Sequence, residues 1–140
     1  MRGYEMNEEL LLNYKKIYQE LKSKDLQTYS QLNLVSKKGG LYIIFDNKND
    51  IVYVGITTTR KNGLNGRLKA HFSGNINSSV FDKAINKENP GLDSKEKLRD
   101  FIRSNFKFVF KEIEKLRERK LTEDFIVSIV DPKYNYYPIN

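Results

Sequence analysis

The chain contains no cysteine and only one histidine, His71. Disulfide bridges and thiolate metal sites are therefore excluded, and a zinc cage built from several Cys or His ligands is implausible. The N-terminal residues lack the apolar core of a secretory signal, and no apolar run is long enough to span a bilayer. These absences predict a cytoplasmic, intracellular protein with no membrane partner.

The remaining composition is that of a folded, basic domain. Hydrophobic residues make up 39% and charged residues 31% of the 140 positions, as in folded chains rather than disordered tails. A chain of this length is expected to fold as one domain. Its formal net charge of +7 favours a polyanionic partner, although a basic balance alone is only suggestive.

Residues 40–56 predict an antiparallel hairpin. The runs G-L-Y-I-I-F and I-V-Y-V-G-I are rich in β-branched and aromatic residues, and the turn-forming segment D-N-K-N-D separates them. With a four-residue loop, 47–50, Tyr42 faces Gly55, and Tyr42 and Tyr53 share one face of the sheet. A five-residue loop would place the two phenols on opposite faces. We expect the first register.

A short helix follows, with Arg67 and His71 one turn apart on the same face. Leu64, Leu68 and Phe72 form its apolar stripe, and Arg67 and His71 lie immediately beside that stripe. A lone histidine is more often structural than catalytic, but its pairing with Arg67 favours a functional role.

The rest of the chain predicts an α+β fold: a small three-stranded antiparallel sheet flanked by helices, with an N-terminal helical extension. Both faces of the first strand are apolar, as in a strand that is covered on two sides. Further elements are expected as an amphipathic helix over 6–22, a short helix over 79–85, a helix from Asp93 or Ser94, a third strand from Phe106, and a last helix, apolar nearly all round, that Pro132 ends. We expect one domain, 1–140, divided into the extension, 1–38, and a core, 39–140.

Five short motifs occur in order along this layout: G-L-Y at Gly40–Tyr42, Y-V-G at Tyr53–Gly55, R-x-x-x-H at Arg67–His71, Glu123, and P-K-Y-N at Pro132–Asn135. In this combination the chain resembles the GIY-YIG nuclease family. Each motif alone is weak, whereas five in the same order are specific. The chain departs from the family pattern at Leu41, where isoleucine is usual, and in a longer loop before Arg67.

The resemblance implies an endonuclease that hydrolyses DNA phosphodiester bonds. Tyr42, or alternatively Tyr53, is then the general base, and His71 orients the phenol or relays its proton. Arg67 stabilises the negative charge on the transferring phosphate. Glu123 holds one divalent ion, Mg²⁺ or Mn²⁺, and the lack of a second strong carboxylate candidate disfavours a two-metal site. Without the motif context, a local salt bridge would be the favoured role for Glu123.

Four more residues are candidate nucleic-acid contacts. Arg60 and Lys61 lie in the polar loop after the hairpin, where phosphate contacts and an ordinary solvated loop are about equally expected. Lys69 lies on the helix that carries Arg67. Asn135 is expected to hydrogen-bond a phosphate or to support Glu123.

The expected partner is double-stranded DNA. One site cuts one strand at a time, so a homodimer is expected for double-strand breaks, and a partner protein could supply specificity. A restriction role and a repair or mobile-element role both stay open. The main alternative is a non-catalytic nucleic-acid-binding module with the same fold, and a weaker one is a protein-interaction module that docks through its N-terminal helix.

Overall fold

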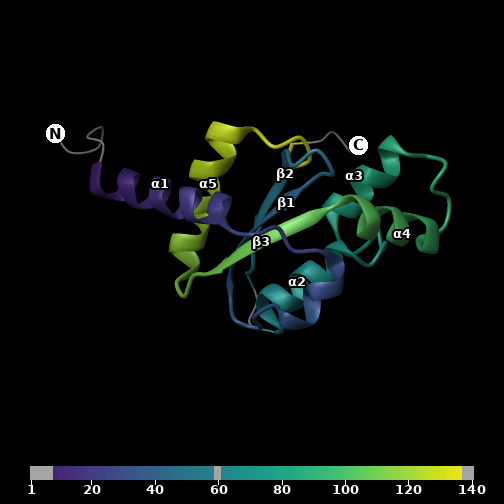
Figure 1. Cartoon of the computed structure of the whole chain (residues 1–140), viewed down its shortest axis with the longest axis horizontal. Coiled ribbons are helices and arrows are strands. Elements are labelled where there is room, and N and C mark those ends of the chain that lie inside the picture. The colour runs from purple at the N-terminus through teal and green to yellow at the C-terminus, as the bar shows by residue number, and fades with distance from the viewer. Residues whose placement is uncertain (1–7, 59–60, 137–140) are drawn as a thin grey trace.

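The computed structural model describes residues 8–58 and 61–136 (Figure 1). Its three strands form one antiparallel sheet, and helices cover both faces of that sheet, which confirms the α+β prediction. None of the described helices has the length and apolarity needed to cross a membrane. In chain order the elements are α1 (Glu8–Ser23), the 3-10 helix η1 (Tyr29–Leu34), β1 (Gly40–Phe45), β2 (Ile51–Ile56), α2 (Gly63–His71), α3 (Val80–Glu88), α4 (Lys95–Asn105), β3 (Lys107–Glu112) and α5 (Leu116–Val130).

The first strand, β1, lies in the middle of the sheet, whose order is β2-β1-β3. Every residue of β1 is buried because each of its faces has its own hydrophobic core. Tyr42 and Ile44 belong to the core beneath η1, α2, α3 and α4. Leu41 and Ile43 belong to the core beneath α1 and α5, which contact each other and cross to the left of the sheet in Figure 1. The strand covered on two sides was thus predicted correctly.

The hairpin has the expected register, although its loop is longer than expected. Five residues, 46–50, separate the strands, and a register shift between Ile44 and Phe45 takes up the extra residue. Tyr42 therefore pairs with Gly55, as predicted. Tyr42 and Tyr53 consequently lie on the same face, with ring centroids 6.3 Å apart.

Both outer strands have partners beyond the sheet. The side-chain amide of Asn135 makes two hydrogen bonds with the backbone of Val54 in β2: it accepts at 2.9 Å and donates at 2.8 Å. On the opposite edge, Gln27 and Phe108 exchange two backbone hydrogen bonds of 2.9 Å. Segments from the two ends of the described chain thus cover the sheet edges.

Two predictions, one of a helix and one of a strand, needed adjustment. The last helix is not apolar all round, because Ile129 is 54% exposed. Asp131, which has a φ of 51°, and then Pro132 end this helix as expected. The third strand begins at Lys107 instead of Phe106, which ends α4 as its C-terminal cap.

Candidate active site

The centre of the site is a hydrogen bond of 2.6 Å between the Tyr42 hydroxyl and Nε2 of His71. β1 supplies the phenol and the last residue of α2 supplies the imidazole, and both side chains are almost completely buried. Gly55 lies directly across the sheet from Tyr42, and a Cβ atom there would collide with the Tyr42 hydroxyl. The glycine of the Y-V-G motif therefore makes room for the phenol to reach His71.

The second ring nitrogen of His71, Nδ1, lies 2.7 Å from the hydroxyl of Ser79. Ser79 caps the N-terminus of α3, where its side chain accepts a hydrogen bond from the backbone N–H of Asp82. Burial, and secondly the Arg67 cation, hold the pKa of His71 well below its ordinary value. The resting ring is therefore neutral, with a proton on one nitrogen and a lone pair on the other.

Tyr53 completes an aromatic group around His71. Its ring centroid lies 5.2 Å from that of the imidazole in an edge-on arrangement, and Tyr53 is less buried than Tyr42. Desolvation raises the pKa of both phenols above the ordinary value of 10, while Arg67 acts in the opposite direction on each. The guanidinium of Arg67 is thus close enough to both hydroxyl groups to influence their ionisation.

Arg67 itself is only partly buried. One guanidinium nitrogen donates a 3.2 Å hydrogen bond to the backbone oxygen of Ser78, and the side chain lines a surface hollow beside the end of β2. Thr57, Thr58 and Lys61 line the same hollow. Arg67 can therefore touch the buried phenols on one side and an incoming anion on the other.

Glu123 lies on α5, and its charge raises the pKa of both Tyr42 and Tyr53. It also makes the expected local salt bridge, at 3.1 Å from Nζ of Lys120. The Lys120 side chain is 61% exposed and lies 3.4 Å from Asp124 as well. Because solvent surrounds the Lys120 end of this pair, another cation can displace Lys120 from Glu123.

The donor set suits a single hard cation. No cluster of three or more His, Asp or Glu residues that could cage a metal occurs in the described part of the chain. Mg²⁺ commonly binds through one or two carboxylates, with water and substrate phosphate completing its coordination. Glu123 matches that pattern, whereas a two-metal centre would need more carboxylates here.

The candidate nucleic-acid contacts have different surroundings. Lys61 and Lys69 are exposed, close to the two ends of α2. Arg60 lies outside the described residues. Asn135 does not contact Glu123 in the described structure. Both groups of its side-chain amide bind the backbone of Val54, so Asn135 holds the C-terminal segment against the edge of the sheet.

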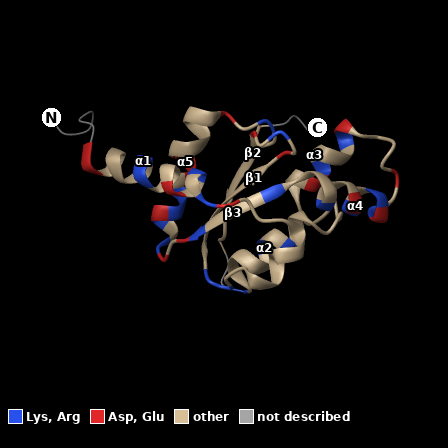
Figure 2. Cartoon of the chain, viewed as in Figure 1, with Lys and Arg blue, Asp and Glu red and all other residues tan. Residues whose placement is uncertain are grey.

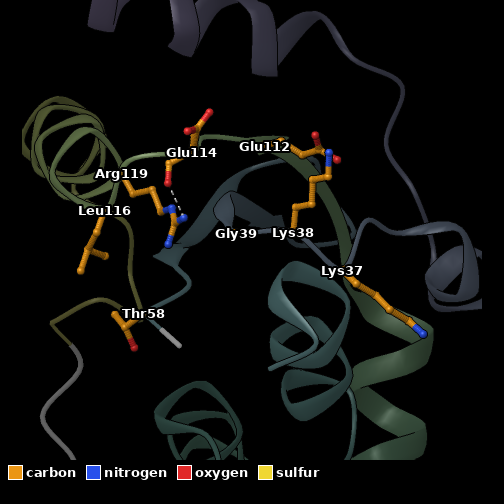
Figure 3. Close-up of a pocket in the computed structure, with 8 residues that line it drawn as sticks. All are labelled: Lys37, Lys38, Gly39, Thr58, Glu112, Glu114, Leu116 and Arg119. Carbon is orange, nitrogen blue, oxygen red and sulfur yellow. Dashed lines mark hydrogen bonds between the residues drawn. The ribbon is translucent and has the colours of Figure 1, made fainter. Parts of the chain in front are cut away.

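A second hollow, shown in Figure 3, meets the first at Thr58. Arg119 of α5 points into it and donates to the backbone oxygens of Ile113 at 2.6 Å, Glu114 at 2.8 Å and Thr57 at 3.1 Å. Gly39 leaves the space for this guanidinium, because a Cβ atom there would collide with it. Arg119 therefore ties the start of α5, the helix of Glu123, to the ends of β2 and β3.

Three residues with evident roles at the site were not singled out from the sequence: Ser79, Asp82 and Arg119. The only local signal for the first two is S-x-x-D at the start of a short helix, which is an ordinary capping pattern. Arg119 belongs to a run of charged residues that looks like a solvated surface. Tertiary contacts, which no local pattern encodes, give these residues their positions.

Comparison with known proteins identifies the family. A model of the GIY-YIG catalytic domain matches residues 38–125, more than half of the chain, and this range contains Tyr42, Tyr53, Arg67, His71 and Glu123. No curated protein sequence matches the chain. The order of the motifs, the antiparallel sheet and the family match agree, and the chain belongs to the GIY-YIG family.

Proposed function

We propose that this protein is a divalent-metal-dependent endonuclease that hydrolyses DNA phosphodiester bonds. The observation that carries the proposal is the hydrogen bond between Tyr42 and His71, placed where Arg67 and Glu123 both act on the phenol electrostatically. A buried phenol, a neutral imidazole, a guanidinium and a carboxylate can together accept a proton from water and stabilise charge beside a phosphate.

Tyr42 is the proposed general base, with His71 as the acceptor of its proton. Burial raises the pKa of Tyr42, so a standing phenolate would be costly at neutral pH. A relay avoids that species: the attacking water gives a proton to Oη of Tyr42 while the phenol gives its own proton to Nε2 of His71. Tyr53 is the alternative base, but no hydrogen bond between its hydroxyl and the imidazole is seen in the described residues.

Arg67 and Glu123 have complementary roles in the proposal. Arg67 would contact the scissile phosphate and stabilise the negative charge that develops on its oxygens. Glu123 would hold a single Mg²⁺ ion, which stabilises the leaving 3′-oxygen when it is bound. GIY-YIG nucleases are generally divalent-metal-dependent, and the choice of Mg²⁺ for this chain is supported by the lack, among the described residues, of any cluster of three or more metal-ligating side chains.

The distribution of charge favours a polyanionic substrate such as DNA. The sequence has no acidic residue from Ile51 to Phe81, a stretch that contains both Arg67 and Lys69. In Figure 2, α2 accordingly carries blue but no red, whereas α4 carries both. A basic surface at the mouth of the site would bind phosphates on either side of the scissile bond.

The test is cleavage of supercoiled plasmids with and without Mg²⁺. We expect nicking or linearisation only with the metal, and loss of at least 100-fold in rate for Arg67→Ala and Glu123→Ala, as for removal of other charge-stabilising groups. Asp124→Ala is the matched control, since Asp124 is the second carboxylate beside Lys120 and has no contact with the phenols in the described structure.

Several plasmids and a long phage genome are needed as substrates, because a rare recognition sequence could be absent from one plasmid. Circular dichroism should show that every variant is folded. DNA binding without cleavage of any substrate, with any divalent metal, would favour the non-catalytic binding module instead.

A further inference from the structure

Ser79 connects the catalytic imidazole to a buried carboxyl group. Its oxygen lies 2.7 Å from Nδ1 of His71 and accepts a 3.2 Å hydrogen bond from the backbone N–H of Asp82. The single hydroxyl proton of Ser79 can go either to Nδ1 of His71 or to the Asp82 carboxylate. This choice decides which nitrogen of His71 carries the ring proton.

The surroundings of Asp82 favour the second choice. Its Oδ2 accepts a 2.9 Å hydrogen bond from the N–H of Gly74, but its buried Oδ1 has no hydrogen-bond partner in the described part of the chain. Desolvation raises the pKa of Asp82 to about 7, and hydrogen bonding by the Ser79 side chain is the largest influence in the opposite direction. Above a pH of about 7 Asp82 is ionised and its buried Oδ1 is an unsatisfied acceptor, so the hydroxyl proton is more stable on the side of Asp82.

We propose that Asp82, acting through Ser79, fixes His71 in the tautomer with its proton on Nδ1. In this arrangement Nδ1–H donates to Oγ of Ser79, and the Ser79 hydroxyl turns toward the Asp82 carboxylate, whose pKa it lowers. The lone pair of Nε2 then faces Tyr42, whose hydroxyl donates to it. Ser79 and Asp82 are positioning residues, because they act on the reaction only through His71.

The effect of this tautomer on catalysis rests on the proposed function. When water gives a proton to Oη of Tyr42, the original phenol proton moves to Nε2 and His71 becomes an imidazolium. Both of its N–H groups then have acceptors, and the negative Asp82 offsets the new positive charge. The opposite tautomer would direct N–H at Tyr42, so His71 could not accept the phenol proton.

The tautomer can be measured without any cleavage assay. His71 is the only histidine of the chain, so in protein freed of any purification tag its imidazole nitrogens give the only such NMR signals. Long-range proton–nitrogen correlation spectra at pH 8 should show Nδ1 protonated in the unsubstituted protein. In Asp82→Asn the new amide donates to Ser79, whose hydroxyl turns to Nδ1, and the ring proton should move to Nε2.

Ser79→Ala should produce the same shift, because Nδ1–H loses its acceptor. Ser79→Thr keeps the hydroxyl and should keep the proton on Nδ1. Ser94→Ala is the matched control: Ser94 caps α4 with the same geometry, accepting at 3.1 Å from the N–H of Lys97, but has no contact with His71. It should leave both the tautomer and the cleavage rate unchanged.

A proton on Nε2 in the unsubstituted protein, or a proton that stays on Nδ1 in either Asp82→Asn or Ser79→Ala, overturns the inference. Cleavage by these two variants should also slow by roughly 10- to 100-fold, a share of the contribution of general-base catalysis. The two failures are distinguishable: a protein that cuts no DNA refutes the proposed function, whereas the NMR spectra alone decide the tautomer.

Discussion

At the scale of single residues, the Tyr42–His71 hydrogen bond depends on Gly55, because a methyl group at this position would occupy the place of the Tyr42 hydroxyl. The phenol cannot easily move, since its ring is buried in the middle strand of the sheet. Gly55→Ala should therefore break the Tyr42–His71 hydrogen bond and lower the free energy of unfolding by about 1–3 kcal/mol, as overpacking does. Urea denaturation and the NMR signals of His71 measure the two effects.

Gly91→Ala is the control for this substitution, because a Cβ atom at Gly91 would have no neighbour within 4 Å. Equal stability of the two alanine variants would show that the space over Gly55 is not needed.

Asp82 gives the protein a pH-dependent stability of definite sign. Its pKa is about 7 when folded and 3.8 ordinarily, so between these values the folded protein holds a proton that the unfolded chain has released. Stability therefore falls as the pH rises through this interval, by at most about 1.4 kcal/mol per pH unit from this group. Urea midpoints at pH 5 and pH 7.5 should differ less in Asp82→Asn than in the unsubstituted protein. Parallel pH profiles for the two proteins would show that Asp82 is not the group responsible.

The chemistry-bearing residues differ in how far local sequence can predict them. Tyr42 and Tyr53 were predicted to share a face because strand pairing follows a strict two-residue period. The contact of His71 with Ser79 needs the turn between α2 and α3 to fold back, which no periodicity encodes. Local sequence could thus predict the relative positions of the proposed catalytic residues only where they lie on regular strands or helices.

At the scale of elements, α5 depends on Arg119 for its place against the sheet. The guanidinium binds three backbone oxygens at the ends of β2 and β3, and Gly39 provides its space. Gly39→Ala and Arg119→Ala should each lower the free energy of unfolding by about 1–3 kcal/mol, since hydrogen bonds of a charged group are lost. The double variant should lose less than the sum, because both changes remove the same contacts.

Denaturation of the single and double variants gives the coupling energy directly. Arg117→Ala, an exposed position on the same helix, should have little effect. Additive losses in the cycle would mean that Gly39 and Arg119 act independently.

Most elements could be predicted because their patterns are local. Asp93 or Ser94 predicted one helix as its cap, and runs of β-branched and aromatic residues predicted the two strands of the hairpin. The bulge that takes up the fifth loop residue was not predictable from local sequence. It reconciles the length of the turn with the pairing of the two strands that carry Tyr42 and Tyr53. The order of the strands likewise depends on contacts between residues far apart in the chain.

At the scale of the whole molecule, the net charge of +7 should make DNA binding strongly dependent on salt. In the Glu123→Ala background, which prevents cleavage under the proposal, the logarithm of affinity should fall linearly with the logarithm of salt concentration. Lys61→Ala and Lys69→Ala should each reduce that slope by about 1 if these residues contact phosphates. Fluorescence anisotropy with a labelled duplex measures the slope.

Lys97→Ala is the control for these variants, because Lys97 is paired with Asp93 at 2.9 Å on α4. Unchanged slopes for Lys61→Ala and Lys69→Ala would place the phosphate contacts elsewhere on the molecule.

The covered sheet edges limit how copies of this chain can associate. Asn135 occupies the backbone of Val54 on one outer strand, and Gln27 occupies that of Phe108 on the other. A strand from a second molecule would have to displace the segments around Asn135 or Gln27 before it could pair with an edge and extend the sheet. A dimer that cuts both DNA strands would therefore associate through helical surfaces or along the DNA itself. The covered edges should also discourage the edge-to-edge strand pairing that leads to fibrils.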